Sequence, residues 1–308
     1  MEGRRRVEEN VGPMTYAFLL RNIAAELTSA NIPNAFQEAF WIVASVSGLS
    51  RPQLAGELSS EVPQAAVLES ERLKRLRKQG IPLAYLLGET EFFGLKFKVS
   101  PAVLIPRPET EVLVEKCRQS LMEKGGKEYT FSILDVGTGS GCIALALLSE
   151  LPQSRAIATD ISKEALKVAK ENAAGLGLAG RLSLVQASLL ESVDGAGRFD
   201  LLVSNPPYVS SDEFPRLDRS VRNFEPTVAL ESPNGGTWFH AQIATQAARV
   251  LKSGGLLALE VGMKQAGEVS ELIRKTGSYQ EPTSFNDLFG VARIVMAKKN
   301  EKFSGFLG

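Results

Sequence analysis

Beyond Glu111, strand-like and helix-like segments alternate along the chain, and this alternation limits the possible folds more than any other feature of the sequence. Apolar segments of strand length lie at residues 131–135, 156–160, 182–186, 199–204, 256–260 and 293–297. Gly254 and Gly255 are expected to form the turn into the fifth of these strands. Alternating strands and helices build a mostly parallel sheet with helices on both faces. We therefore predict a doubly wound, Rossmann-like α/β domain over residues 112–300.

The N-terminal part of the chain has a different pattern. Apolar residues recur there at helical spacing, so a small helical bundle is expected over residues 1–80, with its third helix ending at Gln79-Gly80. Residues 81–111 are expected to be a linker that contains a β-hairpin with its turn near Gly94. Residues 301–308 are expected to be a flexible tail.

Composition argues against several classes of protein. Lysine plus arginine and aspartate plus glutamate each total 35 among 308 residues, so no overall charge attracts nucleic acid. The sequence has no apolar run long enough to span a membrane, and the arginines at residues 4–6 lie among acids, unlike a targeting segment. Cys117, Cys142 and His240 are too scattered for a metal site, so we expect no metal and a cytoplasmic protein. A basic run is expected to be a solvated helix face, namely Arg72, Lys74, Arg75, Arg77 and Lys78.

A glycine-rich segment, residues 135–141, follows the first predicted strand and precedes an apolar helix. Glycines let a backbone turn sharply and approach a ligand closely, and in a doubly wound sheet this turn lies where ligands bind. An acid followed by GxGxG resembles the S-adenosylmethionine loop rather than the GxGxxG of dinucleotide enzymes. Asp135 suits a positively charged sulfonium and would repel a pyrophosphate. Asp160 ends the next strand as the candidate acceptor for ribose hydroxyls, so S-adenosyl-L-methionine is the expected cofactor.

The sequence Ser-Asn-Pro-Pro-Tyr at residues 204–208 follows the fourth predicted strand. Its two prolines make a rigid loop that lacks two backbone donors. The Asn205 side-chain oxygen and the Pro206 carbonyl can accept both hydrogens of a planar NH2 group, on which Tyr208 can stack. Such acceptors would orient a weakly nucleophilic nitrogen and stabilise the positive charge that develops on it. We predict a methyltransferase for an amide or amine nitrogen, with Asn205, Pro206 and Tyr208 as its catalytic residues.

Three further segments make the chain resemble the release factor glutamine N5-methyltransferases, of the HemK or PrmC type. These are IPLAYLLGE at residues 81–89, LIPRPETE at residues 104–111, and FEP followed by AL at residues 224–230. The resemblance implies a seven-stranded methyltransferase domain and a substrate-binding N-terminal domain. It also implies a substrate, the glutamine of the Gly-Gly-Gln loop in peptide-chain release factors, which would become N5-methylglutamine with release of S-adenosylhomocysteine.

The loop chemistry and the resemblance together assign residues to the site. The expected cofactor-binding residues are Asp135, Gly137, Thr138, Gly139, Ser140, Gly141, Asp160, Ser188, Leu189 and Asn205. The expected substrate-binding residues are Arg107, Glu109, Asn205, Pro206, Pro207 and Tyr208. Ser188 departs from the family pattern, because an acid there commonly takes the adenine amino group, and a serine adds no charge. Ala292 stands where the family often has aspartate.

Other functions remain open at the level of sequence. A similar Asn-Pro-Pro-Tyr loop can grip an exocyclic amino group of a nucleobase in DNA or RNA. The chain is also compatible with a non-catalytic, cofactor-binding translation partner, and more remotely with a nicotinamide-dependent dehydrogenase. The sequence does not specify the preferred release factor, the oligomeric state or, in a cell with organelles, the compartment.

Overall fold

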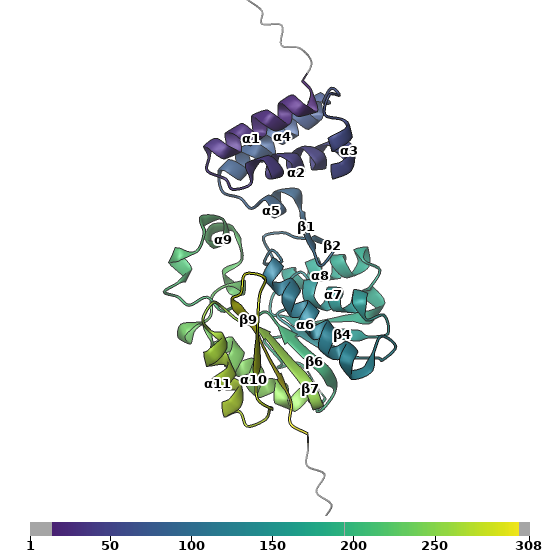
Figure 1. Cartoon of the computed structure of the whole chain (residues 1–308), viewed down its shortest axis with the longest axis vertical. Helices are drawn as coiled ribbons and strands as arrows, with labels where there is room; N and C mark the ends of the chain where they lie inside the picture. Colours follow the sequence, from purple (N-terminus) through teal and green to yellow (C-terminus); the bar gives the residue numbers. More distant parts are fainter. Residues whose placement is uncertain (1–13, 194, 302–308) are drawn as a thin grey trace, which may run out of the picture. The chain divides into compact units, whose positions relative to one another are not determined.

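The computed structural model describes residues 14–193 and 195–301 and forms two compact units that divide between Leu87 and Gly88 (Figure 1). The arginines at residues 4–6 and residues 302–308 of the expected tail lie outside the described residues. Within the described part of the chain, no helix is both long and apolar enough to cross a membrane.

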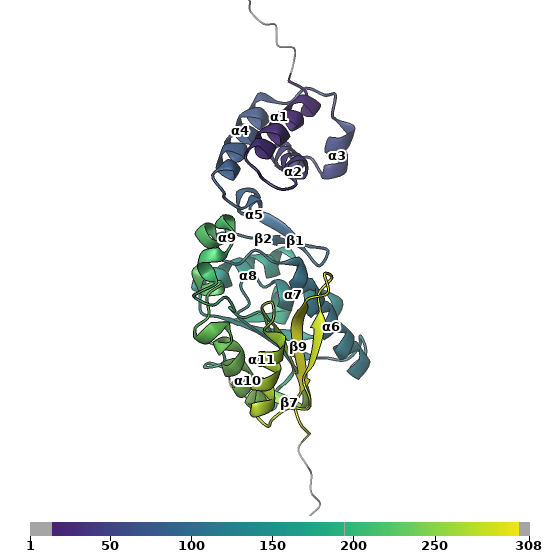
Figure 2. The same cartoon turned by 60° about the vertical axis from the view of Figure 1, so that its left-hand side comes forward.

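The N-terminal unit is a bundle of helices (Figure 2). Its elements are α1 (Tyr16–Ser29), α2 (Ala35–Ser47), α3 (Arg51–Gly56), α4 (Gln64–Lys78) and α5 (Leu83–Leu87). Apolar side chains at helical spacing, among them Leu19, Ile23 and Leu27 of α1, are buried in its core. The Thr15 side chain caps α1, while Ser50 and Gln53 form a capping box at α3. The helix expected to end at residues 79–80 ends at Lys78.

The basic run lies on α4, where several of its cations form ion pairs within the unit. Lys74 is buried and contacts Glu26 and Glu71, and Lys78 contacts the same Glu26. Arg77 lies 2.7 Å from Glu38 of α2. These pairs join α4 to α1 and α2, so part of the run stabilises the bundle and is not simply a solvated face.

The second unit begins with a hairpin of β1 (Glu89–Phe92) and β2 (Leu95–Lys98), followed by α6 (Pro108–Gly125). Phe92 and Phe97 of the hairpin are fully buried in the same core cluster as Leu113 and Val114 of α6. Asn172 of α8 (Lys163–Gly175) fixes the hairpin further, because its side chain accepts from Lys98 N at 2.7 Å and donates to Lys98 O at 3.0 Å. The same amide donates to Ser140 O at 2.9 Å, so one buried residue joins the hairpin to the glycine-rich loop.

A seven-stranded sheet in the order β5-β4-β3-β6-β7-β9-β8 forms the centre of this unit and confirms the predicted fold class. Its strands are β3 (Ser132–Val136), β4 (Arg155–Asp160), β5 (Leu182–Gln186), β6 (Phe199–Ser204), β7 (Leu251–Glu260), β8 (Thr283–Asn286) and β9 (Ala292–Lys298). The first five are parallel to one another, β9 is antiparallel to β7, and β8 is antiparallel to β9. The order reverses between β3 and β6, which is the switch point where such sheets bind ligands.

Alternate side chains of the strands are buried on opposite faces of the sheet. Ile133 and Leu201 pack with α6, α7 (Cys142–Glu150) and α8. Leu134 and Leu202 pack with α10 (Trp238–Val250) and α11 (Ala266–Lys275). A short helix, α9 (Arg219–Phe224), lies in the long connection between β6 and β7. Helices cover both faces of the sheet, so its faces are apolar and polar side chains are found mainly at the ends of the strands.

The predicted turn at Gly254-Gly255 is wrong, because β7 already begins at Leu251. Leu251 pairs with Phe199, and Leu256 pairs with Leu201. Between these two pairs β7 has more residues than β6, so the register shifts and β7 forms a bulge there. Gly254 has φ +66°, and a side chain on Gly255 would lie 3.0 Å from Phe199 O. The glycines therefore permit a bulge inside a strand, which the local sequence does not distinguish from a turn.

We expect the replacement Asn172→Ala to destabilise the second unit by about 2–4 kcal/mol, because it removes the side-chain partner of three backbone groups, two on the part-buried Lys98 backbone and one on the buried Ser140 backbone. Urea unfolding measures the effect. A Trp41→Phe background leaves Trp238 as the single tryptophan reporter, since the chain has two tryptophans and the other lies in the N-terminal unit. The exposed Asn223→Ala is the matched control and should stay within about 0.5 kcal/mol of its parent. Equal effects of the two replacements would contradict the role of Asn172.

Candidate functional site

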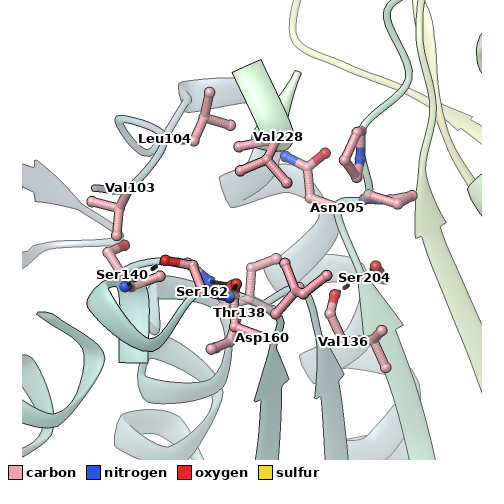
Figure 3. Close-up of a pocket in the computed structure, with 18 of the residues that line it drawn as sticks. Val103, Leu104, Val136, Thr138, Ser140, Asp160, Ser162, Ser204, Asn205 and Val228 are labelled. Carbon is pink, nitrogen blue, oxygen red and sulfur yellow. Dashed lines mark hydrogen bonds between the residues drawn. The ribbon is translucent and has the colours of Figure 1, made fainter. Parts of the chain in front are cut away.

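The carboxyl ends of β3, β4, β5 and β6 surround one cavity in the second unit (Figure 3). Ser140 and Asp160 lie on one side of it, and Asn205 lies across from them. Of the expected site residues, the cavity brings together Arg107, Gly137, Thr138, Gly139, Ser140, Asp160, Ser188, Leu189, Asn205, Pro206 and Pro207. Four others do not line it, namely Glu109, Asp135, Gly141 and Tyr208.

The glycine-rich loop after β3 has the backbone shape that its sequence predicts. Gly137, Gly139 and Gly141 have φ of 72°, 55° and 83°, a backbone region that residues other than glycine rarely adopt. Gly139 N donates to Asp160 Oδ2 at 2.8 Å, which ties the loop to the end of β4. Gly141 faces α8 rather than the cavity, and a side chain there would lie 3.3 Å from Ala169 Cβ. The loop is thus shaped by contacts on both of its sides.

Asp135 lies beneath this loop and is fully buried. Its Oδ2 accepts from the Thr138 hydroxyl at 2.7 Å and from Ala144 N at 3.2 Å. The carboxylate therefore holds the loop and the first turn of α7 together, and Asp135 does not itself line the cavity. Burial raises the pKa of Asp135 to about 7, and the nearby Asp160 charge adds to the shift.

Asp160 faces the cavity from the end of β4. Its Oδ2 accepts from Gly139 N, and its Oδ1 accepts from Ser162 N at 2.9 Å. Burial raises its pKa, and these backbone donors oppose the shift. Each carboxylate oxygen has a second lone pair, so the group can still accept hydrogen bonds from ligand hydroxyls. Ser188 and Leu189 follow β5 nearby, and the Thr159 hydroxyl bonds Leu189 O at 3.2 Å.

The segment of residues 204–208, which we call the acceptor loop, follows β6 and lines two cavities. Ser204 donates to Val136 O at 2.7 Å, so the start of the loop is tied to β3. Asn205 lines both the first cavity and an adjoining one, as do Leu104 and Arg107. Tyr208 lines only the adjoining cavity, and its main-chain oxygen accepts from Gln265 Nε2 at 2.9 Å. Burial raises the pKa of Tyr208, so its hydroxyl is neutral.

A buried glutamate joins two of the segments on which the family resemblance rests. Glu225 is 5% exposed, and one of its oxygens contacts the guanidinium of Arg107. Its other oxygen accepts from Ile105 N at 3.2 Å. Glu225 therefore holds the loop before α6 and orients Arg107 at the boundary of the two cavities.

Sequence reasoning missed two residues that contact Asn205 from behind. Thr110 lies in the first turn of α6 and lines the first cavity, whereas Glu260 ends β7. Burial raises the pKa of Glu260 to about 7, and its hydrogen bond from Thr110 lowers it. An acid at a strand end, as at Asp160, was the signal that could have found Glu260. His240 is buried, its Nε2 lies 2.8 Å from Glu260 O, and burial lowers its pKa to about 4.

No group of three or more His, Cys, Asp or Glu residues is placed to hold a metal ion within residues 14–193 and 195–301. The polar groups around the site are backbone donors, buried acids and the amide of Asn205.

Comparisons with known proteins identify the family of this chain. Residues 19–88 match the model of the PrmC N-terminal domain, and residues 110–219 match that of the Methyltransferase small domain. The Release factor glutamine methyltransferase of Moorella thermoacetica is 39% identical over 94% of this chain and 100% of its own length. The enzyme of that name from Bradyrhizobium diazoefficiens is 37% identical over 91% of this chain and 93% of its own length. The chain belongs to the release factor glutamine methyltransferase family.

A solved structure supports the fold independently. The catalytic domain of hMettl16, in complex with the MAT2A 3′UTR hairpin 6, aligns with a TM-score of 0.52. The alignment covers 73% of this chain and 81% of that one, with 19% sequence identity. This chain and that catalytic domain therefore share a fold.

We expect Asp135 to make stability depend on pH. Its pKa is 3.8 in an ordinary carboxyl and about 7 in the folded chain, so the folded state holds the proton more tightly. The stability that Asp135 contributes is fully present below pH 3.8 and is lost as the pH rises through about 7. The unfolding free energy of the wild type minus that of Asp135→Asn should therefore fall across this window in urea titrations. A difference that stays constant with pH would contradict it, and Asp212→Asn, at an exposed residue, is the control.

Proposed function

We propose that the chain transfers a methyl group from S-adenosyl-L-methionine to the side-chain amide nitrogen of the glutamine in the Gly-Gly-Gln motif of peptide-chain release factors. The products are N5-methylglutamine and S-adenosylhomocysteine. The observation that carries the proposal is the place of Asn205, which lines both a cavity suited to the cofactor and an adjoining cavity open to a substrate side chain. The relatives' names supply the identity of the substrate.

The first cavity fits the proposed cofactor. Asp160 can accept from ribose hydroxyls, because its backbone partners leave acceptor capacity on both oxygens. Ser140 also lines the cavity and adds a hydroxyl group to its wall. Ile161 and Leu189 offer apolar surface for a planar base, and Ser188 can accept from an amino group. Bound there, S-adenosylmethionine supplies a methyl group already activated by its sulfonium.

The chain's own contribution is to orient the acceptor nitrogen. Asn205 Oδ1 and the Pro206 carbonyl accept the two hydrogens of the substrate amide, and Tyr208 packs beside them from the adjoining cavity. These acceptors favour the nitrogen as it gains positive charge. His240 is neutral and faces the backbone of Glu260, so it is not placed as a base. Catalysis then consists mainly of alignment, which contributes up to about 7–11 kcal/mol in well-oriented reactions.

The adjoining cavity suits the peptide around the target glutamine. Arg107, Arg216 and Arg293 line it, and their guanidinium groups can donate to peptide carbonyls. Glycines beside the glutamine leave those carbonyls uncovered, which fits a Gly-Gly-Gln loop. We assign binding of the rest of the release factor to the helical domain of residues 1–80, and the 81–111 linker to joining it with the catalytic domain of residues 112–300. Such a substrate places the protein with the ribosomes of the cytoplasm.

We expect label from methyl-labelled S-adenosylmethionine to appear on a purified release factor and to disappear when the motif glutamine is replaced by alanine. Asn205→Ala enzyme should lose roughly 10²–10³-fold in kcat/KM, as other enzymes do when one group that stabilises the transition state is removed. Scintillation counting and mass spectrometry of the labelled peptide locate the methyl group. The exposed Asn223→Ala enzyme is the matched control and should label the release factor like the wild type.

Two results would contradict the proposed substrate. One is an unlabelled release factor together with labelled DNA or RNA, which would favour the nucleobase alternative; phosphate contacts would then give a steep salt dependence. The other is cofactor binding without transfer to any release factor, which would favour a non-catalytic translation partner.

Asp160→Asn should weaken binding of S-adenosylmethionine about tenfold or more, because hydrogen bonds to a charged acceptor contribute about 1.5–3 kcal/mol. Isothermal titration calorimetry measures the dissociation constant directly. Asp212→Asn should bind the cofactor like the wild type, since Asp212 is exposed and lines neither cavity. Unchanged affinity in Asp160→Asn would remove Asp160 from the proposed cofactor contacts.

A further inference from the structure

Thr110, Glu260 and Asn205 form a hydrogen-bond chain behind the acceptor site. The Thr110 hydroxyl donates to Glu260 Oε2 at 2.6 Å, and Asn205 Nδ2 donates to the Thr110 hydroxyl oxygen at 3.2 Å. The three residues come from the first turn of α6, the loop after β6 and the end of β7. Thr110 and Glu260 are 2% and 1% exposed, so water scarcely competes for these bonds.

The direction of this chain follows from the chemistry of its groups. An ionised carboxylate can only accept, so the single hydroxyl hydrogen of Thr110 is used in the bond to Glu260. The Thr110 oxygen can then only accept from its other neighbour, which must present a donor. Asn205 therefore turns its NH2 end toward Thr110 and its oxygen away from it. The assignment of the two amide ends thus rests on the hydrogen-bond network and not on their nearly identical shapes.

We infer that Thr110 and Glu260 are positioning residues, which hold the Asn205 carboxamide with its oxygen toward the substrate amide. The inference rests on the proposed function of Asn205 as an acceptor for substrate hydrogens. A half-turn of the carboxamide would place its NH2 group against the substrate NH2, donor against donor, and would remove one acceptor from the site. Because Thr110 and Glu260 are buried, water cannot replace their hydrogen bonds and hold the Asn205 carboxamide in the required orientation.

The test compares Thr110→Val with Thr110→Ser. Valine keeps the shape of threonine but removes the hydroxyl, whereas serine keeps the hydroxyl. The matched control is Thr237→Val, because the Thr237 hydroxyl is also buried and also donates to a glutamate, Glu268, at 2.8 Å, outside both cavities. Each variant is assayed with the full-length release factor for kcat and KM, for cofactor affinity by calorimetry, and for thermal unfolding.

Thr110→Val should lose roughly 10- to 100-fold in kcat/KM, somewhat less than the loss expected for direct removal of a transition-state contact. Its cofactor dissociation constant should stay within about twofold of the wild type, and Thr110→Ser should recover most of the activity. Affinity for the release factor in the presence of S-adenosylhomocysteine should fall in Thr110→Val and not in Thr237→Val. Wild-type kcat/KM in Thr110→Val, or a loss no larger than in Thr237→Val, would overturn the inference.

Failure of the proposed function has a different signature. In that case the wild-type enzyme itself leaves the release-factor glutamine unlabelled, and the Thr110 variants cannot be ranked on that substrate. Their effect on whichever substrate the wild type does methylate then tests the positioning role of the same hydrogen-bond chain.

Glu260 gives a second readout, because only its ionised form fixes the direction of the chain. A protonated Glu260 can donate to Thr110, which then becomes free to donate to the Asn205 oxygen. Burial raises the pKa of Glu260 to about 7, within the range of an activity assay. Titratable or charged groups near it come from five segments, namely Glu109 of α6, Cys142 of α7, Tyr208 after β6, His240 of α10 and Arg293 of β9.

The kcat/KM of the wild type should therefore rise with pH through the Glu260 pKa of about 7. Glu260→Gln should be less active than the wild type at high pH and should lack this rise. Asp135→Asn is the control for the other buried acid with a pKa of about 7, and its profile should keep the rise. A Glu260→Gln enzyme with the wild-type activity and pH profile would overturn the role of Glu260.

Discussion

The parallel register of β3, β4, β6 and β7 is the constraint on which the site depends. Parallel strands end at the same edge of a sheet, so residues that follow them are brought together although they lie far apart in the sequence. Asp135 pairs with Ala158 on one side and with Val203 on the other, and Val203 pairs with Ala258. The same register places the glycine-rich loop, the end of β4 and the acceptor loop around one cavity.

Three acids near this edge have different roles because their surroundings differ. Asp135 is buried under the glycine-rich loop, where its Oδ2 accepts from Thr138 and Ala144, so it shapes the loop. Asp160 accepts backbone hydrogen bonds but still faces the cavity, so it can bind a ligand. Glu260 is buried behind Asn205 and accepts from Thr110, so it can act on the substrate only through those two residues. Burial raises the pKa of all three, and the local donors decide what each carboxylate can do.

The sequence predicted the conformation of the chain well where that conformation follows from local backbone chemistry. Glycines at residues 137, 139 and 141 adopt the left-handed conformations that their pattern indicated, and Asn205 follows a strand as expected. The sequence was less informative about the direction in which individual side chains point. Glu109 and Tyr208 were both expected to bind the substrate, yet Glu109 lines neither cavity, and Tyr208 lines only the adjoining one. Gly254 and Gly255 were read as a turn because a bulge within a strand needs the same residues.

The sequence by itself determined the fold class, the glycine-rich loop and the family, and it singled out Asn205 as the candidate acceptor, because each depends on residues that are close together in the chain. Only the tertiary structure decided that Glu225 holds Arg107, that Asp135 lies under its loop, and that Thr110 and Glu260 meet behind Asn205. Residues 110 and 260 are 150 positions apart. Their contact depends on the order of the strands and on the packing of α6 against the sheet, and no local pattern encodes either of these.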